Sequence, residues 1–165
     1  MTVLTVQAVT VGLGEVKIAT PASAEALLAL GLGSCVGVVL FDPLARVGGM
    51  AHVVLPEPPA GAPASPKFAT HAVPTLLERV LARGAVQERL VCKIAGGAQV
   101  LAVNGLRDSF RIGERNVTAV QAALRRLGIV PRAADCGGTT GRSLRLSLSD
   151  GRVAVKRLGE DWREL

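Results

Sequence analysis

The sequence predicts a single α/β domain whose sheet is mixed and rich in hairpins. The chain has 165 residues, a length typical of one domain. Several short strand-like segments alternate with two segments of helical periodicity, which favours mixed strands and helices. Of its residues, 49% are hydrophobic and 2% are aromatic, so the chain can bury a substantial core made mainly of aliphatic side chains. This apolar content excludes a disordered chain.

The first strand signals lie in residues 36–55. Residues 36–41 are apolar and largely β-branched, which is typical of a buried strand, and Asp42-Pro43 follows as a turn signal. Residues 50–55 (MAHVVL) form the next predicted strand. The segment 56–66 (PEPPAGAPASP) contains five prolines and predicts a loop, which could lie beside a functional site.

Two segments have the apolar spacing of helices. Residues 70–83 predict a helix that ends at Gly84, with Pro74 in its first turn. Residues 116–127 predict a second helix, with Gly128 as its stop. Both segments carry their apolar side chains on one face, as a helix that covers a sheet would.

The remaining strands lie around and after these helices. Residues 90–95 (LVCKIA) predict a strand closed by Gly96-Gly97, and residues 129–136 an extended segment. Residues 143–149 and 152–158 alternate apolar and polar side chains around Asp150-Gly151, the strongest hairpin signal in the chain. Frequent hairpins favour a largely antiparallel or mixed sheet over a doubly wound parallel one.

Charge and cysteine usage limit the class of protein. The net charge is +6, and most of it lies from Arg107 onward, where 12 basic and 7 acidic residues occur. These basic residues are scattered among apolar positions and stacking aromatics are scarce, so a solvated basic surface is favoured over nucleic-acid binding. Three widely spaced cysteines indicate neither a disulfide framework nor a zinc site. Without a signal peptide or a long apolar run, we expect a cytoplasmic protein that does not insert into membranes.

The segment 31–39 (GLGSCVGVV) carries the main candidate for chemistry. In a hairpin, opposite residues have numbers with a constant sum, and for Cys35 and His52 a sum of 87 places the turn between Pro43 and Leu44. In that register the two side chains share a face with Cβ atoms about 4.5–5.5 Å apart. An imidazole at that distance activates a thiol. A turn centred on Arg46 would offset the pair.

Other interpretations of these residues stay open. A strand cysteine is often inert core, and a strand histidine is often structural. The flanking glycines allow a backbone or a substrate to approach closely, and the N–H groups around Gly33 and Ser34 could form an oxyanion hole. The glycine spacing also resembles a dinucleotide loop, but a strand follows it and no strand clearly precedes it, which excludes that interpretation. The other cysteines and His71 have no such partner.

Several ordered motifs resemble one family. Residues 30–56 read LGLGSCVGVVLFDPLARVGGMAHVVLP. This segment closely resembles the signature of the CheD-type chemoreceptor glutamine deamidases of bacterial and archaeal chemotaxis. Further similar motifs follow in the family's order: Lys67-Phe68-Ala69, Lys93–Ala98 (K-I-x-G-G-A), Ile112–Asn116 (I-G-x-R-N), and Asp135–Arg142 (D-x-G-G-x-x-G-R). The match spans nearly the whole chain.

The resemblance implies a fold and an activity. The fold would be a three-layer α/β/α sandwich, distantly similar to the catalytic domain of the deamidating cytotoxic necrotizing toxins. The activity would be hydrolysis of glutamine side chains on methyl-accepting chemotaxis proteins to glutamate and ammonia, without a metal or organic cofactor. Cys35 would be the nucleophile and His52 its base. Members also bind the chemotaxis phosphatase CheC, a second expected partner.

One position departs from the family's pattern. The third active-site residue of the family is a threonine six positions before the cysteine, where this chain has Ala29. A methyl group cannot orient an imidazole, although a backbone carbonyl, a water or another hydroxyl could do so. Loss of an orienting group usually weakens such a pair more than it abolishes it. The alternative is a regulatory binding partner of the CheC-type phosphatase with little deamidase activity.

Overall fold

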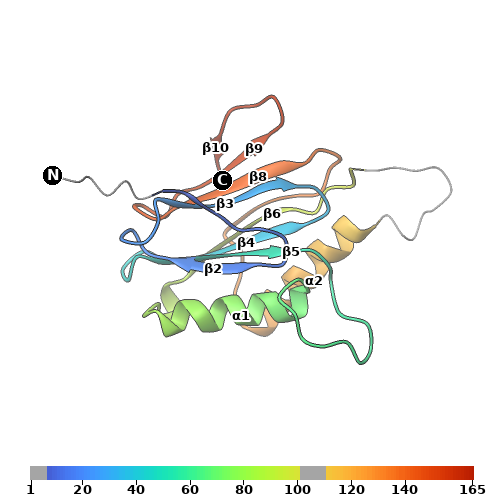
Figure 1. Ribbon diagram of the computed structural model, residues 1–165, viewed down its shortest axis with the longest axis horizontal. Coiled ribbons are helices and arrows are strands. Elements are labelled where there is room, and N and C mark those ends of the chain that lie inside the picture. Colours follow the sequence, from blue (N-terminus) through green and yellow to red (C-terminus); the bar gives the residue numbers. More distant parts are fainter. Residues whose placement is uncertain (1–6, 101–110) are drawn as a thin grey trace.

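The computed structural model describes residues 7–100 and 111–165 and contains two five-stranded sheets and two α-helices (Figure 1). One sheet, here called the central sheet, has the strand order β2-β5-β4-β6-β7. The other, here called the outer sheet, has the order β1-β3-β8-β9-β10. Each sheet contains one parallel and three antiparallel pairings, so both are mixed.

The elements have the following bounds. The central sheet comprises β2 (Val16–Ala19), β4 (Val36–Asp42), β5 (Val47–Val53), β6 (Val91–Gly96) and β7 (Ala133–Cys136). The outer sheet comprises β1 (Val9–Thr10), β3 (Ala26–Leu32), β8 (Arg142–Ser147), β9 (Val153–Arg157) and β10 (Arg163–Glu164). The helices are α1 (Ala69–Ala82) and α2 (Ile112–Arg126), and a short 3-10 helix spans Gln87–Arg89.

The layers follow the order helices, central sheet, outer sheet (Figure 1). One buried cluster joins both helices to the central sheet and includes Leu76, Leu124 and Val38. A second cluster, here called the intersheet cluster, joins the two sheets and includes Met50 and Leu144. The predicted α/β class with three layers is confirmed, and the outer sheet takes the place of the second helical layer. Within the described residues, no helix is long and apolar enough to span a membrane.

Strands β4 and β5 form the middle of the molecule. All seven residues of each strand are buried, because helices cover one face and the outer sheet covers the other. Glycines in these strands allow the layers to pack closely. A Cβ on Gly37 would lie 2.6 Å from Leu144, and one on Gly49 would lie 2.6 Å from both Ile18 and Leu76. These glycines therefore bring the layers together, and the space beside them is already filled.

The structure corrects several predicted boundaries. Helix α1 begins at Ala69, so Pro74 lies in its second turn rather than its first. Helix α2 begins at Ile112, one turn before the predicted start. Strand β5 begins at Val47, since the Gly48-Gly49 pair belongs to the ladder with β4. The C-terminal hairpin of β8 and β9 is confirmed.

Strand β3 was not predicted from the sequence. It leads directly into the glycine-rich segment, so the statement that no strand precedes that segment is wrong. Alanine and leucine dominate β3, and these residues have no strand preference of their own. Pairing with β1 and β8 makes the segment a strand. The dinucleotide interpretation still fails, because a strand follows the glycines where that motif requires a helix.

A buried carboxylate organises the turn between β4 and β5. Asp42 is fully buried and its side chain accepts hydrogen bonds from the N–H groups of Leu44, Ala45 and Val86 and from the Arg89 guanidinium. Burial alone would raise the pKa of Asp42, yet the hydrogen bond from Arg89 and those from the backbone lower it well below its ordinary value. The ionised carboxylate therefore stabilises the fold.

We expect Asp42→Asn to destabilise the protein by about 1.5–3 kcal/mol at pH 7, because bonds to a charged acceptor are lost. A carboxyl with a lowered pKa contributes stability above its ordinary pKa, and this contribution is lost as the pH falls below that value. The difference between variant and wild type should therefore shrink on acidification in urea unfolding measurements. Asp150→Asn, at a half-exposed turn position, is the control and should cost less than about 1 kcal/mol. Equal costs at both positions would contradict this account.

Candidate active site

The hairpin of β4 and β5 differs in register from the predicted one. Gly37 pairs with His52 and Asp42 with Val47, a residue sum of 89 rather than 87. The predicted register would need a two-residue turn at Pro43-Leu44. The favoured two-residue turns require a positive φ at the first position, which proline cannot adopt. The observed four-residue loop 43–46 instead places its positive φ, 55°, at Arg46.

Cys35 and His52 nevertheless share one side of the central sheet. Because Cys35 lies two residues before Gly37, it is on the same side as Gly37 and its partner His52. The two are diagonal neighbours, for which Cα separations of about 7–8 Å are typical. Cys35 is half-buried and packs against the intersheet cluster, and His52 is buried on that side. Both candidate residues therefore lie between the two sheets.

The turn before β2 holds His52 at three points. Its Nδ1 lies 3.0 Å from the carbonyl oxygen of Val11, and its backbone N–H and carbonyl bond to Glu15 and Gly14 at 3.0 Å each. A carbonyl oxygen can only accept, so Nδ1 carries the proton in this bond. In the neutral ring Nε2 is then the unprotonated nitrogen, as a general base requires. No signal in the sequence pointed to Val11.

The turn itself is stabilised by Glu15. Its carboxylate accepts a hydrogen bond from the Gly12 N–H at 2.8 Å and pairs with Lys17 at 3.0 Å. The bond from Gly12 and the contact with Lys17 lower the pKa of Glu15. Glu15 is thus ionised at neutral pH, and it holds the segment that presents the Val11 carbonyl to His52.

The loop before β4 has all three of its carbonyl groups bound. Gly33 accepts from the Ala98 N–H at 2.8 Å, Ser34 accepts from the Asn116 side chain at 2.9 Å, and Cys35 accepts from the Gly97 N–H at 2.8 Å. We call residues 33–35, which contain the candidate nucleophile Cys35, the nucleophile loop. Within residues 7–100 and 111–165, its N–H groups donate to no carbonyl and to no other residue's side chain. N–H groups in such a position could donate to an oxyanion, and this role of Gly33 and Ser34 remains a prediction.

The surroundings of Cys35 favour its uncharged thiol. Burial raises the pKa of Cys35, while its own backbone N–H acts in the opposite direction. A reactive thiolate would thus need a base to remove the proton. Burial also raises the pKa of Cys92 to about 12 and raises the pKa of Cys136. Both lie in or against the helix-side core, as expected for cysteines with a packing role.

Ala29 lies inside the intersheet cluster. It is fully buried on β3 and pairs with Leu144 of β8. The position therefore belongs to the same layer as Cys35 and His52, although its methyl group cannot accept a hydrogen bond. The ring nitrogen that such a residue would orient is already bound to the Val11 carbonyl.

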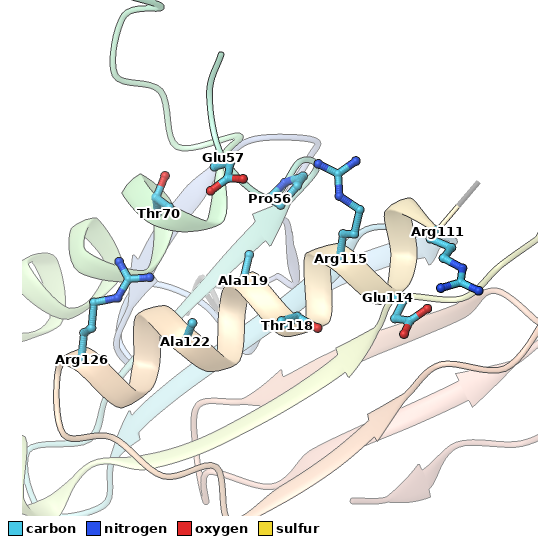
Figure 2. Close-up of a pocket in the computed structure, with 10 residues that line it drawn as sticks. All are labelled: Pro56, Glu57, Thr70, Arg111, Glu114, Arg115, Thr118, Ala119, Ala122 and Arg126. Carbon is cyan, nitrogen blue, oxygen red and sulfur yellow. The ribbon is translucent and has the colours of Figure 1, made fainter. Parts of the chain in front are cut away.

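A separate groove of about 660 Å³ lies on the helical side of the molecule (Figure 2). Arg115 and Arg126 lie on α2, and Arg111 immediately precedes it. Glu57 and Thr70 lie across from that helix. Neither Cys35 nor His52 lines this groove, since both lie on the opposite side of the central sheet. Among the residues that the structure describes, no group of three or more His, Cys, Asp or Glu side chains could hold a metal ion.

Comparison with known proteins gives the family. The family model described as "CheD chemotactic sensory transduction" matches residues 54–157, well over half of the chain. A probable chemoreceptor glutamine deamidase CheD from Archaeoglobus fulgidus is 44% identical over 154 residues, which cover 92% of this chain and 96% of that protein. The chain belongs to the CheD family. A protein of the same description from Symbiobacterium thermophilum is 44% identical over 159 residues, covering 94% of this chain and 95% of its own.

The CheD motifs converge on the nucleophile loop. The segment resembling K-I-x-G-G-A supplies Gly97 and Ala98, and the segment resembling I-G-x-R-N supplies Asn116. The Asp-x-Gly-Gly segment comes next: Gly137 donates to the Gly96 carbonyl, and Gly138 accepts from Gln99. Motifs that are far apart in the sequence thus form consecutive supports of one loop. Their order alone did not predict this arrangement.

Proposed function

We propose that this chain hydrolyses the side-chain amide of selected glutamines on methyl-accepting chemotaxis receptors, with Cys35 as nucleophile and His52 as base. Relatives named chemoreceptor glutamine deamidases, similar over nine tenths of the chain, support the reaction. The observation that carries the mechanism is the bond from His52 Nδ1 to the Val11 carbonyl, which leaves Nε2 unprotonated on the side of the sheet that holds Cys35.

The reaction begins with a neutral thiol. His52 Nε2 takes the proton of Cys35 as the sulfur attacks the glutamine carboxamide carbon. The developing oxyanion receives hydrogen bonds from N–H groups of the nucleophile loop, including Ser34 and Cys35. The imidazolium then returns the proton to the departing nitrogen, which leaves as ammonia. In the second half His52 removes a proton from water, which attacks the thioester and releases glutamate and the Cys35 thiol.

The test is incubation of the purified protein with the cytoplasmic fragment of a chemoreceptor, followed by peptide mass spectrometry for glutamine-to-glutamate conversion. The proposal expects conversion at a few defined sites in the native fragment. It also expects retention of a covalent acyl-enzyme at Cys35 when the reaction is quenched in acid. Absence of conversion across several receptor fragments would refute the enzymatic proposal.

The second candidate is a regulatory partner of a CheC-type phosphatase with little deamidase activity. Ala29 favours it, because the family's threonine is missing at that position. The Val11 carbonyl reduces the weight of that argument, since it already binds the ring nitrogen that needs an orienting group. Binding to the phosphatase and stimulation of its activity on phosphorylated response regulator test this role. A protein that binds and stimulates but converts no glutamine would establish the second candidate.

The Ala29→Thr variant tests whether the missing threonine limits deamidase activity. If Val11 already orients His52, the substitution should change kcat by less than about threefold, because the ring gains no necessary partner. It should also lower stability by about 1–3 kcal/mol, since extra atoms enter a fully buried position. Ala19→Thr, in the same intersheet cluster at the far end of β2, is the matched control. A kcat more than tenfold above wild type for Ala29→Thr alone would show that the missing threonine limits activity.

A further inference from the structure

Asn116 connects the two halves of the candidate active site. This side chain is fully buried on α2, and its Nδ2 group donates to the carbonyl of Ser34 and to the carbonyl of Val54, both at 2.9 Å. Ser34 immediately precedes the candidate nucleophile, and Val54 lies two residues after His52. One primary amide therefore bonds to both segments at the point where the β4–β5 ladder ends, at Val36 and Val53.

This connection requires a side chain that can donate two hydrogen bonds. Two carbonyl groups cannot bond to each other, so the backbone cannot continue the ladder between Ser34 and Val54. An NH₂ group carries two N–H donors and can satisfy both acceptors from one nitrogen. An apolar side chain of similar size would leave both carbonyls without this partner. A carboxylate would fail in the same way, because it only accepts.

The planarity of the peptide bond gives this contact a further consequence. In a trans peptide the carbonyl of one residue and the N–H of the next point in opposite directions. Asn116 holds the Ser34 carbonyl toward the helical side. The N–H of Cys35 therefore points away from the helices, to the side of the sheet where the thiol and His52 lie. The Ala98 N–H holds the Gly33 carbonyl, so the orientation of the Gly33–Ser34 peptide is fixed as well.

Glycines fix the position from which Asn116 acts. A Cβ on Gly113 would lie 2.6 Å from the carbonyl oxygens of Gly97 and Ala98, so the first turn of α2 rests directly on that backbone. Gly97 has a φ of +69°, and a Cβ there would lie 2.2 Å from Val117. The helix start and the 97–98 backbone thus pack without intervening side chains. The nucleophile loop is bound by α2 and by residues 97–98, and these two supports pack directly against each other.

We propose that Asn116 is a positioning residue of the deamidation site, which aims the Cys35 N–H at the oxyanion and sets the nucleophile loop against the His52 strand. This inference rests on the proposed function, since it assigns a role within the same reaction. Asn116 does not touch the substrate; it acts through the Ser34–Cys35 peptide.

The test compares Asn116→Leu with Val120→Ala. Leucine is neutral, similar in size and has no donor, whereas Val120 is a buried α2 residue one turn further on that bonds to neither segment. With a receptor fragment, Asn116→Leu should lower kcat by about 30- to 100-fold with KM changed less than threefold, because an oxyanion donor is misaligned. Val120→Ala should lower the melting temperature but leave kcat within threefold of wild type.

A second readout does not depend on deamidation. The Cys35 N–H lowers the pKa of its own thiol, so misaligning it should move the pH profile of Cys35 alkylation by iodoacetamide toward alkaline pH. This shift is expected in Asn116→Leu and not in Val120→Ala. If the leucine variant does not fold, Asn116→Ser, which keeps a single donor, should lose at least tenfold in kcat. Unchanged kcat and an unchanged alkylation profile in the variant that folds would overturn the role of Asn116.

The two proposals can fail separately. If wild type converts no glutamine but the alkylation profiles differ as expected, the deamidase proposal is wrong and the positioning of the Cys35 N–H stands. If wild type converts glutamine and Asn116→Leu does so equally well, the reaction stands and the positioning role is wrong.

Discussion

Replacing Cys35 by alanine is expected to lower the rate of glutamine conversion by at least about 10⁴-fold, because no other group can form the acyl-enzyme. The measurement is the same mass-spectrometric assay under single-turnover conditions. Cys92→Ala is the matched control, since Cys92 is a buried cysteine of the helix-side core, away from the candidate site. That variant should stay within about threefold of wild type.

His52→Gln should have an effect of similar size, and the double variant should be no slower than either single one. Groups that act as one unit in a reaction have non-additive effects on its rate. A Cys35→Ala protein that retains more than a tenth of the wild-type rate would contradict the proposed nucleophile. Additive losses in the double variant would instead indicate that Cys35 and His52 act in separate steps.

The second large effect concerns stability and lies at Asp135. This buried carboxylate accepts hydrogen bonds from Arg142, Arg157 and Arg163, so one anion compensates the charge of three guanidinium groups. Asp135→Asn should destabilise the protein by about 3 kcal/mol, because removing one partner leaves buried charge without compensation. For a chain of this length the melting temperature should fall by roughly 6–12 °C.

The control for Asp135→Asn is Asp161→Asn at an exposed position, which should change the melting temperature by no more than about 2 °C. The cluster also reaches the candidate active site. Arg142 donates to the Gly137 carbonyl, and Gly137 in turn donates to Gly96, beside the nucleophile loop. We therefore expect the folded Asp135→Asn protein to lose activity as well. A variant with wild-type stability would refute the structural role of this carboxylate.

The sequence predicted the pair of strands that carries Cys35 and His52 but missed its register by two residues. The error came from placing the turn at the first proline signal, whereas the conformational limits of Pro43 exclude a two-residue turn there. Side chains alternate between the two faces of a strand, so a register error of two residues leaves each side chain on the same face. The prediction that Cys35 and His52 share a face was therefore correct. The roles of Cys35 and His52 remain predictions.

Other features had no sequence signal of their own. The partner of His52 is a backbone carbonyl, and any residue at position 11 would present one. Strand β3 consists of alanine, leucine and glycine, so only its pairing with β8 makes it extended. Asn116 lay at the predicted start of a helix, where an asparagine is ordinary as a cap. Its bonds to Ser34 and Val54 depend on contacts between residues 62 or more positions apart.

The turn that holds His52 leads into β2, the edge strand of the central sheet, whereas His52 itself lies on a strand buried on both faces. Edge segments open locally at a lower free-energy cost than central strands. Amide hydrogens of residues 11–15 should thus exchange with deuterium before those of β4 and β5. If the proposed function is correct, mild denaturant should abolish deamidation while the β4–β5 hairpin is still folded.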